Sequence, residues 1–429
     1  MAATEEEQKP PPHLGARTLF LLFFLAFGVR LTVAGARGFD KPRFGDWEGF
    51  VVAAKQLVHT GSYPDRTNAL FFRPPGYAFF LAAATLGHPE NIALDKAVGA
   101  AAGGLVAPLL ALLSIRLFRR RGLAIAAGIA GALHPPFVLF SSDVESETIF
   151  IPLLLSSGGL LLAAADRAST RLALPAGIAL GVAALTRPSA LALAPLLAAP
   201  LWDRRSPLRA RSMLAAVAIS GFLLALAPWI VRNLVHFGEL IPVSDEGGCA
   251  FFDGNSHWAN QLYELKDQKD VESINIAMHQ DKVARLEAAG VGPGTKAFES
   301  PSKRSLTLVR STLEERRRDP AGTVRLFLRK TWHWIRPYPM LFWSLPVVVS
   351  ASVLYTVLYV LGGLGLKVAE RRGAVWFAVA VLGISTAVHV LVLVLWRYRV
   401  PYWDPILLLY GARGAAEIFP QGRRVSLAR

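Results

Sequence analysis

The sequence contains very little cysteine: Cys249 is the only one in 429 residues. A single cysteine excludes an intramolecular disulfide and any metal cluster built from cysteines. The sequence also lacks a P-loop, a dinucleotide-binding GxGxxG motif after a strand and an HExxH zinc motif. We therefore expect no cofactor and no metal site, although carboxylates at a membrane interface can bind a divalent ion.

Charged residues are scarce within the long apolar runs, where Asp95 is the main exception. Hydrophobic residues make up 53% of the chain and its mean hydropathy is +0.39. Several runs approach the roughly 20 residues that cross a bilayer. Acidic residues are outnumbered 31 to 46 by lysine and arginine. The arginines gather at the ends of apolar runs. This placement indicates that they set the membrane topology and contact lipid headgroups, and it does not indicate nucleic-acid binding.

Ten apolar runs are predicted to be transmembrane helices, which makes the chain an all-α polytopic membrane protein. They lie at residues 18–34, 92–117, 122–140, 148–165, 172–185, 190–202, 213–231, 340–366, 374–396 and 402–418. With a cytoplasmic N-terminus, the short arginine clusters, such as Arg119-Arg120-Arg121, all fall on the cytoplasmic side. This agreement requires the run at 74–86, about 13 residues long, to lie at the interface instead of spanning. We predict a multi-pass protein of the cytoplasmic (inner) membrane.

This topology divides the chain into segments. They are a disordered cytoplasmic tail (1–17), an N-terminal transmembrane catalytic module (18–232) whose first external loop is 37–91, an external loop domain (233–339), C-terminal transmembrane helices (340–418) and a cytoplasmic tail (419–429). In the external domain, Ser302 is expected to cap a helix that ends at Arg318. Asp319 then precedes Pro320, which begins a basic, aromatic helix that we expect at the membrane interface.

Acids and arginines converge on the predicted external face. The candidates are Asp46, Arg73, Glu147, Arg187, Arg397 and Arg399. Transfer from a lipid-linked phosphate needs such a set, since a carboxylate takes a proton from the acceptor and guanidinium groups bind the phosphate. Plainer interpretations stay open. Asp46 can cap a helix, and Glu147 can be a solvated acid that the helix dipole stabilises at the start of a span. The arginines can anchor helix ends at the membrane interface.

The order of short motifs resembles the polytopic GT-C glycosyltransferases, in particular the bacterial branch of ArnT and the protein O-mannosyltransferases. The motifs are Gly45-Asp46, Gly61-Ser62-Tyr63-Pro64, Arg73-Pro74-Pro75-Gly76-Tyr77, Ser146-Glu147, Leu185-Thr186-Arg187-Pro188, Gly254-Asn255 and Arg397-Tyr398-Arg399 with Pro401. The resemblance implies a GT-C-like fold, with interfacial helices in the first external loop and a small external domain.

The resemblance also implies roles. Asp46 becomes the catalytic base and Glu147 the second active-site acid, a position that Asp143 or Glu145 could take instead. The phosphate contacts become Arg73, where the ArnT branch has lysine, together with Arg187, Arg397 and Arg399. The sequence departs from the pattern where Trp47 follows Asp46, since some members have an Asp-Glu pair there.

The implied reaction is an inverting transfer of a hexose or pentose from a polyprenyl-phosphate donor. The acceptor is a hydroxyl of a glycan, lipid or protein on the periplasmic or exterior side. The rival function is a transporter or flippase for a glycolipid or anionic substrate, which would place ionisable groups inside its spans.

Overall fold

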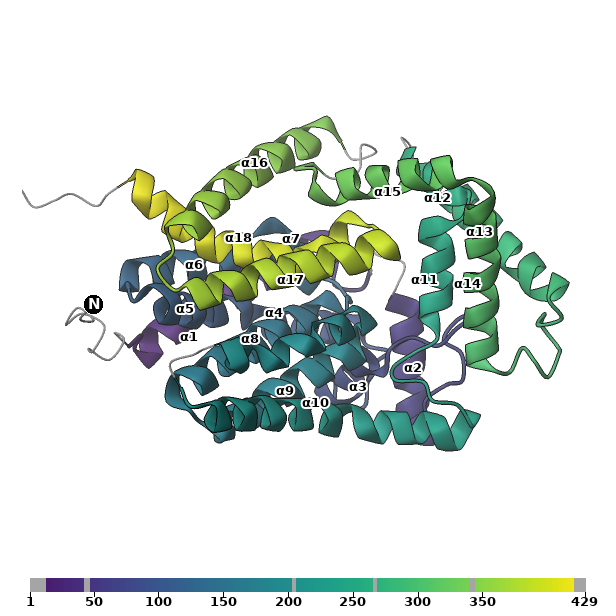
Figure 1. Cartoon of the computed structure of the whole chain (residues 1–429), viewed down its shortest axis with the longest axis horizontal. Helices are drawn as coiled ribbons and strands as arrows, with labels where there is room; N and C mark the ends of the chain where they lie inside the picture. Colours follow the sequence, from purple (N-terminus) through teal and green to yellow (C-terminus); the bar gives the residue numbers. More distant parts are fainter. Residues whose placement is uncertain (1–12, 42–46, 203–205, 265–267, 339–343, 420–429) are drawn as a thin grey trace, which may run out of the picture.

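A computed structural model describes residues 13–41, 47–202, 206–264, 268–338 and 344–419. These residues form helices and no strand, which confirms the all-α prediction. Long helices run side by side along the long axis of the molecule, and shorter helices gather at one end (Figure 1). Most of the two predicted tails lies outside the described residues.

The first half of the chain supplies most of the long helices. They and their connecting helices are α1 (Ala16–Arg37), α2 (Trp47–Thr60), α3 (Pro75–Ala84), α4 (Ile92–Gly104), α5 (Val106–Phe118), α6 (Arg121–Leu133), α7 (Pro135–Ser141), α8 (Glu147–Arg167), α9 (Thr170–Thr186), the 3₁₀ segment η2 (Pro188–Trp202) and α10 (Leu208–Phe237). The second half continues with α11 (Glu246–Asn255), α12 (Trp258–Glu264), α13 (Gln268–Ala288), α14 (Pro301–Arg318), α15 (Pro320–Ile335), α16 (Leu345–Val368), α17 (Arg372–Leu391) and α18 (Trp396–Ile418).

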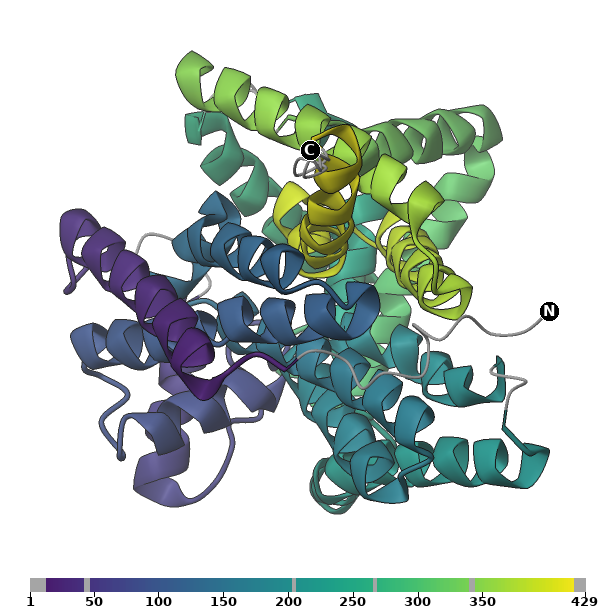
Figure 2. The same ribbon diagram turned by 90° about the vertical axis from the view of Figure 1, so that its left-hand side faces the viewer.

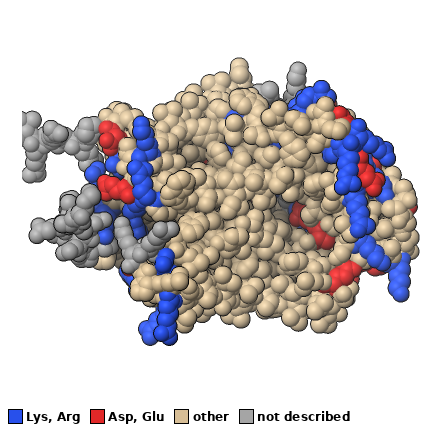
Figure 3. All heavy atoms as spheres, in the orientation of Figure 1, with Lys and Arg blue, Asp and Glu red and all other residues tan. Residues whose placement is uncertain are grey.

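Six of the described helices are long and apolar enough to cross a membrane. They are α1, the continuous pair α4–α5, α8, α10, α16 and α17, and the pair α6–α7, bent by 51°, can add a seventh. The apolar helices α9 and η2 are shorter, and α18 contains three arginines and two acids. Basic side chains gather at both ends of the molecule and leave a broad band almost free of charge (Figure 3). The chain is a multi-pass membrane protein, and the count of about ten spans stays a prediction.

The two ends of the described chain lie together. The beginning of α1 and the end of α18 are at the left in Figure 1 and face the viewer in Figure 2. The short helices α2, α3 and α11 to α15 lie at the opposite end. The run predicted to lie at the interface forms the ten-residue α3, which packs against α2 and α9.

Two predicted boundaries are wrong. The span predicted at 374–396 ends at Leu391, and α18 begins at Trp396, so Arg397 and Arg399 start the last helix. The Val392 carbonyl in the break accepts hydrogen bonds from the side chains of Asn255 and Lys330, at 2.9 and 3.2 Å. These partners come from α11 and α15, which a continuous apolar sequence does not reveal.

The second correction concerns the caps of the external helices. The Ser300 hydroxyl, and not Ser302, accepts from the Lys303 N–H, because Pro301 occupies the first position of α14. The carboxylate of Asp319 caps α15 as predicted and accepts from the Gly322 N–H at 2.8 Å.

Backbones approach closely where α9 crosses α10 and where α16 crosses α18. A Cβ at Gly177 would overlap the Ala218 carbonyl, and a Cβ at Gly365 would overlap the Tyr410 carbonyl. Small residues at such crossings let membrane helices make extensive van der Waals contact. The second crossing fixes α18, which carries part of the candidate site, beside α16.

The break between α6 and α7 has its own polar partners. His134 precedes Pro135 and has extended backbone, as residues before proline prefer. The carbonyls of Gly131 and Ala132 accept hydrogen bonds from the buried Arg30 guanidinium of α1, at 3.5 and 3.1 Å. Unpaired carbonyls are costly in apolar surroundings, so Arg30 stabilises the break.

Candidate active site

Three acids lie close together between the end of α7 and the first residue of α8. Asp143, Glu145 and Glu147 are buried, with at most 1% of each residue exposed. Buried carboxylates are costly unless cations pair with them. The cations that pair with this acidic loop (residues 143–147) come from α1, α4, α9 and α18.

Arg187 is the first of these cations. It directly follows α9, and Pro188 keeps its backbone extended, which ends the helix there. Its Nη1 lies 2.7 Å from Glu147 Oε1 and donates to the Ser146 hydroxyl at 3.1 Å. The guanidinium also lies over the Tyr398 ring, 4.8 Å from its centroid.

Arg397, in the first turn of α18, contacts two acids of the loop. Its Nη2 lies 3.2 Å from Glu145 Oε2, and its Nε lies 3.2 Å from Glu147 Oε1. The side chains of Arg397 and Arg187 are 21% and 14% exposed, whereas the two carboxylates are at most 1% exposed. The two carboxylates are therefore more deeply buried than the two arginine side chains, which are partly accessible to an anion.

Asp143 is paired on the other side of the loop. Lys96 Nζ of α4 lies 3.7 Å from Asp143 Oδ1, and Arg37 Nη2 at the end of α1 lies 3.7 Å from Oδ2. Lys96 also donates to the carbonyls of Gly38 and Lys41, at 2.9 and 2.7 Å. Lys96 thus connects the start of the first loop to the acidic loop.

Tyr77 of α3 lies among the same acids. Burial, followed by the nearby carboxylates of Asp95, Glu145, Glu147 and Asp143, raises the pKa of Tyr77 well above its usual value. Its hydroxyl and both carboxylate oxygens of the buried Asp95 have no hydrogen-bond partner among the described residues. Buried polar groups rarely lack hydrogen-bond partners, so the surroundings of Tyr77 and Asp95 are unusual.

Arg73 contacts residues of α2 and α11. Its guanidinium stacks over the Phe50 ring of α2 at 5.0 Å, and its Nη1 lies 3.7 Å from Glu246 Oε1 of α11. Asp46 lies outside the described residues, directly before α2. Its predicted role as the base stays a prediction.

Arg399 is fully buried, two residues after Arg397, and its contacts differ. Its Nη1 donates to the carbonyls of Trp334 and Arg336 at the end of α15, at 2.9 and 2.8 Å. The guanidinium also lies over the Tyr355 ring, 4.6 Å from its centroid. These contacts join α15, α16 and α18, and they separate Arg399 from the Arg187–Glu147–Arg397 group.

An apolar groove with a cavity volume of about 120 Å³ runs beside the last helix. Side chains of α5, α8, α9, η2 and α17 form its walls with one face of α18, which presents Pro401, Tyr402, Pro405, Ile406, Leu409 and Tyr410. Tyr402 packs edge-on against Phe150, at 5.6 Å between centroids, and Arg187 lies over that same Phe150 ring at 5.8 Å. The rings of Tyr402 and Phe150 therefore link the groove to the Arg187 guanidinium.

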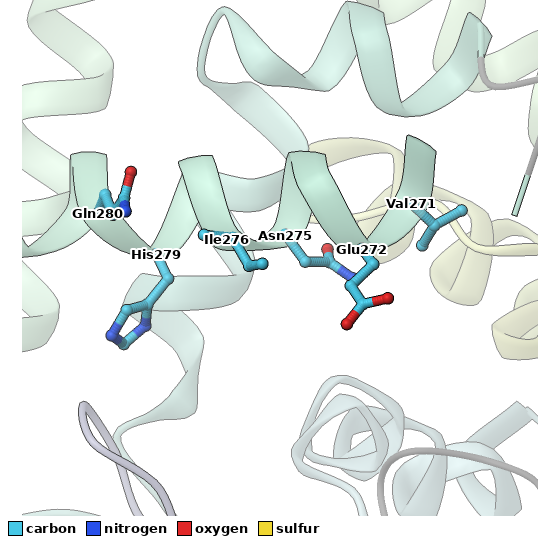
Figure 4. A pocket seen from close by; sticks show the side chains of 6 residues that line it. All are labelled: Val271, Glu272, Asn275, Ile276, His279 and Gln280. Carbon is cyan, nitrogen blue, oxygen red and sulfur yellow. The ribbon is translucent and has the colours of Figure 1, made fainter. Parts of the chain in front are cut away.

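A second hollow lies beside α13, away from the acidic loop. Figure 4 shows six side chains that line it: Val271, Glu272, Asn275, Ile276, His279 and Gln280. All six come from one helix, so no second element closes the hollow. Among the described residues, no group of three or more His, Cys, Asp or Glu side chains is arranged to hold a metal ion.

Solved membrane glycosyltransferases are similar to this chain. The archaeal oligosaccharyltransferase AglB from Archaeoglobus fulgidus, solved with an inhibitory peptide and a dolichol-phosphate, matches 94% of the chain at 15% identity with a TM-score of 0.53. The match covers 50% of AglB, so the chain spans about half the length of that protein. The chain has the GT-C fold.

Another GT-C protein, ArnT from Cupriavidus metallidurans, is similar at lower scores. Its apo structure matches 95% of the chain and 80% of ArnT at 15% identity, with a TM-score of 0.43. The structure bound to undecaprenyl phosphate gives the same coverage at 14% identity and a TM-score of 0.35. No family model and no curated protein sequence matches the chain. The GT-C fold class predicted from the order of motifs is confirmed.

Sequence reasoning missed several residues of this candidate site and of the contacts that support it. Lys96 directly follows Asp95, and Arg37 lies just after the first apolar run. Both could therefore have been found as cations near the predicted external acids. Asp404, His134 and Arg30 lie inside apolar runs that were expected to be almost free of charge. Their partners come from distant helices, so no local pattern indicates them.

Proposed function

We propose that this chain is a membrane glycosyltransferase. It moves a sugar from a polyprenyl-phosphate donor to an acceptor hydroxyl on the extracytoplasmic side of the cytoplasmic membrane. The observation that carries the proposal is the pair of partly exposed arginine side chains, Arg187 and Arg397, of which Arg187 is linked to an apolar groove through the rings of Phe150 and Tyr402. An anionic headgroup with a long apolar tail fits both parts at once.

The groove is suited to the isoprenoid tail. Its lining on α18 repeats at residues 401, 402, 405, 406, 409 and 410, so one apolar face continues along the helix. The distance from 401 to 410 is about 13 Å at the rise of an α-helix. The fold adds support, because AglB, with which the chain shares it, was solved with a dolichol-phosphate.

The reaction needs a base, a nucleophile and a leaving group. In the proposed step Asp46 takes the proton of the acceptor hydroxyl, whose oxygen forms a bond to the anomeric carbon. The bond between that carbon and the phosphate oxygen breaks, and its electron pair leaves with the polyprenyl phosphate. Attack from the opposite face inverts the configuration. Arg187 and Arg397 offset the charge that develops on the phosphate, and Arg73 is the third proposed contact.

Glu147 acts in this scheme by holding the guanidinium groups. Its carboxylate is fully buried and lies near both Arg187 and Arg397. A carboxylate paired with two cations fixes their orientation before the donor binds, so less order has to be created on binding. We therefore assign Glu147 a positioning role in the site, and Glu145 the same role for Arg397.

The test compares cells without the gene, with the wild-type gene and with the Asp46→Asn variant. Mass spectrometry measures the pool of polyprenyl-phosphate sugars and the masses of surface glycans and lipids. Without the protein, we expect the lipid-linked sugar to accumulate and one sugar increment to disappear from the acceptor. Asp46→Asn should match the deletion, because loss of a positioned base costs about 10² to 10⁴ in rate.

The control is Asp65→Asn, which changes an acid of the same loop that is 58% exposed and bonded to His236. It should restore the wild-type masses. An unchanged lipid-linked pool in the deletion strain would contradict the enzyme. Transport of a labelled glycolipid across vesicles by the purified wild type, without sugar transfer, would favour the transporter instead. A folded Asp46→Asn protein with full activity would exclude Asp46 as the base.

A further inference from the structure

The last helix contacts the α7 segment at two levels. At the outer level Arg397 pairs with Glu145 and Glu147 of the acidic loop. At the deeper level the Asp404 carboxylate lies 2.7 Å from His134 Nε2, at the break where α7 begins. Asp404 follows Arg397 by seven residues (404 − 397), and this spacing places both on the same face of an α-helix.

A tyrosine from a third helix completes the deeper contact. The Tyr355 hydroxyl of α16 donates to Asp404 Oδ2 at 2.5 Å. His134, Tyr355 and Asp404 are 3%, 1% and 0% exposed. A carboxylate at such a place is expensive, and an apolar residue of similar size would pack without that cost. We therefore infer that the cluster of His134, Tyr355 and Asp404 has a role other than filling the core.

Hydrogen bonds are directional, so they can fix the position of one helix against another more narrowly than apolar packing does. With its proton on Nε2, His134 donates to Asp404 and sets both the rotation and the height of α7 against α18. The acidic loop starts only one residue after the end of α7, since Ser142 alone lies between Ser141 and Asp143. A shift of α7 along α18 would therefore move Glu145 and Glu147 away from Arg397.

We propose that His134, Asp404 and Tyr355 form a positioning network that holds the acidic loop in register with Arg397, and that the site loses its affinity for a lipid phosphate without it. The role for lipid phosphate rests on the proposed function. None of the three residues touches the reacting atoms in this assignment. The network acts through α7 and α18, and residues that position ligand groups typically contribute about 10- to 100-fold in affinity or activity.

A matched pair of tyrosines on α16 gives the sharpest variants. Tyr355→Phe removes the hydroxyl that donates to Asp404. Tyr359→Phe removes a hydroxyl one turn further along that has no hydrogen-bond partner among the described residues. Both changes delete one oxygen from the same helix, so a difference between them reports the bonds of the Tyr355 hydroxyl, to Asp404 and to the neighbouring Arg399. His134→Leu and His134→Gln form a second pair, because glutamine keeps an N–H donor.

Hydrogen exchange of the purified full-length protein measures the loop without any transfer reaction. The amides of Ser142, Asp143 and Thr148 are bonded to the carbonyls of Val138, Phe140 and Glu145, so a peptide over 141–148 reports the loop. We expect faster exchange in that peptide for Tyr355→Phe and His134→Leu. Tyr359→Phe should exchange like the wild type, and His134→Gln should recover most of the protection.

Binding of undecaprenyl phosphate, measured by native mass spectrometry, is the second readout. Tyr355→Phe and His134→Leu should raise the Kd by about tenfold, and Tyr359→Phe should leave it unchanged. Equal exchange in both tyrosine variants, or exchange that rises equally throughout α6, α8 and α18, would overturn the proposal in favour of a purely stabilising role. If the wild type binds no undecaprenyl phosphate but the loop still responds, the proposed function fails while the network stands.

Discussion

Arg187 and Glu147 form a buried ion pair, with 2.7 Å between Nη1 and Oε1. Glu147 begins α8 and Arg187 directly follows α9, so the two consecutive helices form a hairpin that returns the chain to the level at which it started. The pair joins the two open ends of that hairpin. Its geometry therefore depends on helix length as much as on the two residues themselves.

Removing Arg187 should destabilise the protein more than removing a surface partner. Arg187→Ala leaves Glu147 buried with Arg397 alone, and breaking a buried pair costs about 3–5 kcal/mol, of which we expect the lower end. The double variant Arg187→Ala/Glu147→Ala should recover part of the loss. Denaturation in detergent measures both. The control is Asp166→Asn, because its pairs with Arg116 and Arg371 are about one-quarter to one-third exposed and should each contribute at most about 1 kcal/mol.

Arg397 and Arg399 should respond differently to the same substitution. Arg397→Gln removes a proposed phosphate contact and should raise the Kd for undecaprenyl phosphate by about tenfold or more, since a hydrogen bond to a charged group contributes about 1.5–3 kcal/mol. Arg399→Gln loses its bonds to the Trp334 and Arg336 carbonyls and should lower the Tm instead. If Arg399→Gln weakens binding as strongly at an unchanged Tm, the phosphate role predicted from the sequence applies to Arg399 as well.

Two glycines on α16 offer a test of the crossing with α18. Gly365→Ala places a methyl group against the Tyr410 carbonyl, whereas Gly363→Ala meets open space. We expect Gly365→Ala to lower the Tm, at a cost of about 1–3 kcal/mol for overpacking, and Gly363→Ala to leave the Tm within error. Equal Tm values for the two variants would mean that the helices separate easily at this point.

Lys330 should make the stability of the protein sensitive to pH. Burial lowers the pKa of Lys330 from its usual 10.5 to about 7, and its ammonium group lies 3.0 Å from Asn255 Oδ1. Between pH 7 and 10.5 the unfolded chain binds this proton and the folded chain does not, so stability rises with pH over that window. The slope approaches about 1.4 kcal/mol per pH unit, and below pH 7 it disappears.

Thermal unfolding at pH values from 6.5 to 9.5 measures this slope. The Lys330→Met variant should lose it. The exposed Lys303→Met, in the neighbouring helix α14, should keep the wild-type slope. A wild-type slope in Lys330→Met would assign the pH dependence to other groups.

The sequence predicts the parts of this site that local chemistry defines. Apolar runs and flanking arginines place the spans, and Thr186-Arg187-Pro188 marks a helix end because proline stops the preceding helix. Glu147 could be found because it begins an apolar run on the predicted external side. The ion pair between Arg187 and Glu147 could not be predicted, since it depends on α8 and α9 having matched lengths.

The rest depends on contacts between distant segments. The break after Leu391 is held by Asn255 and Lys330, and the sequence around it reads as one continuous span. Asp404 looks like an isolated acid in an apolar run until His134 and Tyr355 are placed beside it. Asp46 lies outside the described residues, so the base stays a sequence prediction.

The break before Pro135 has a consequence for how the protein is made. Its partners are far apart in synthesis: Arg30 bonds to a carbonyl 102 positions later, and Asp404 arrives 270 positions after His134. When the first helix is made, Arg30 can bond to the Ala26 carbonyl of the same helix, but its acceptors at Gly131 and Ala132 do not yet exist, and His134 is made long before Asp404. Packing of the helices therefore finishes only after the last helix has been made, and a nascent protein interrupted before α18 would contain His134 without the acid that pairs with it.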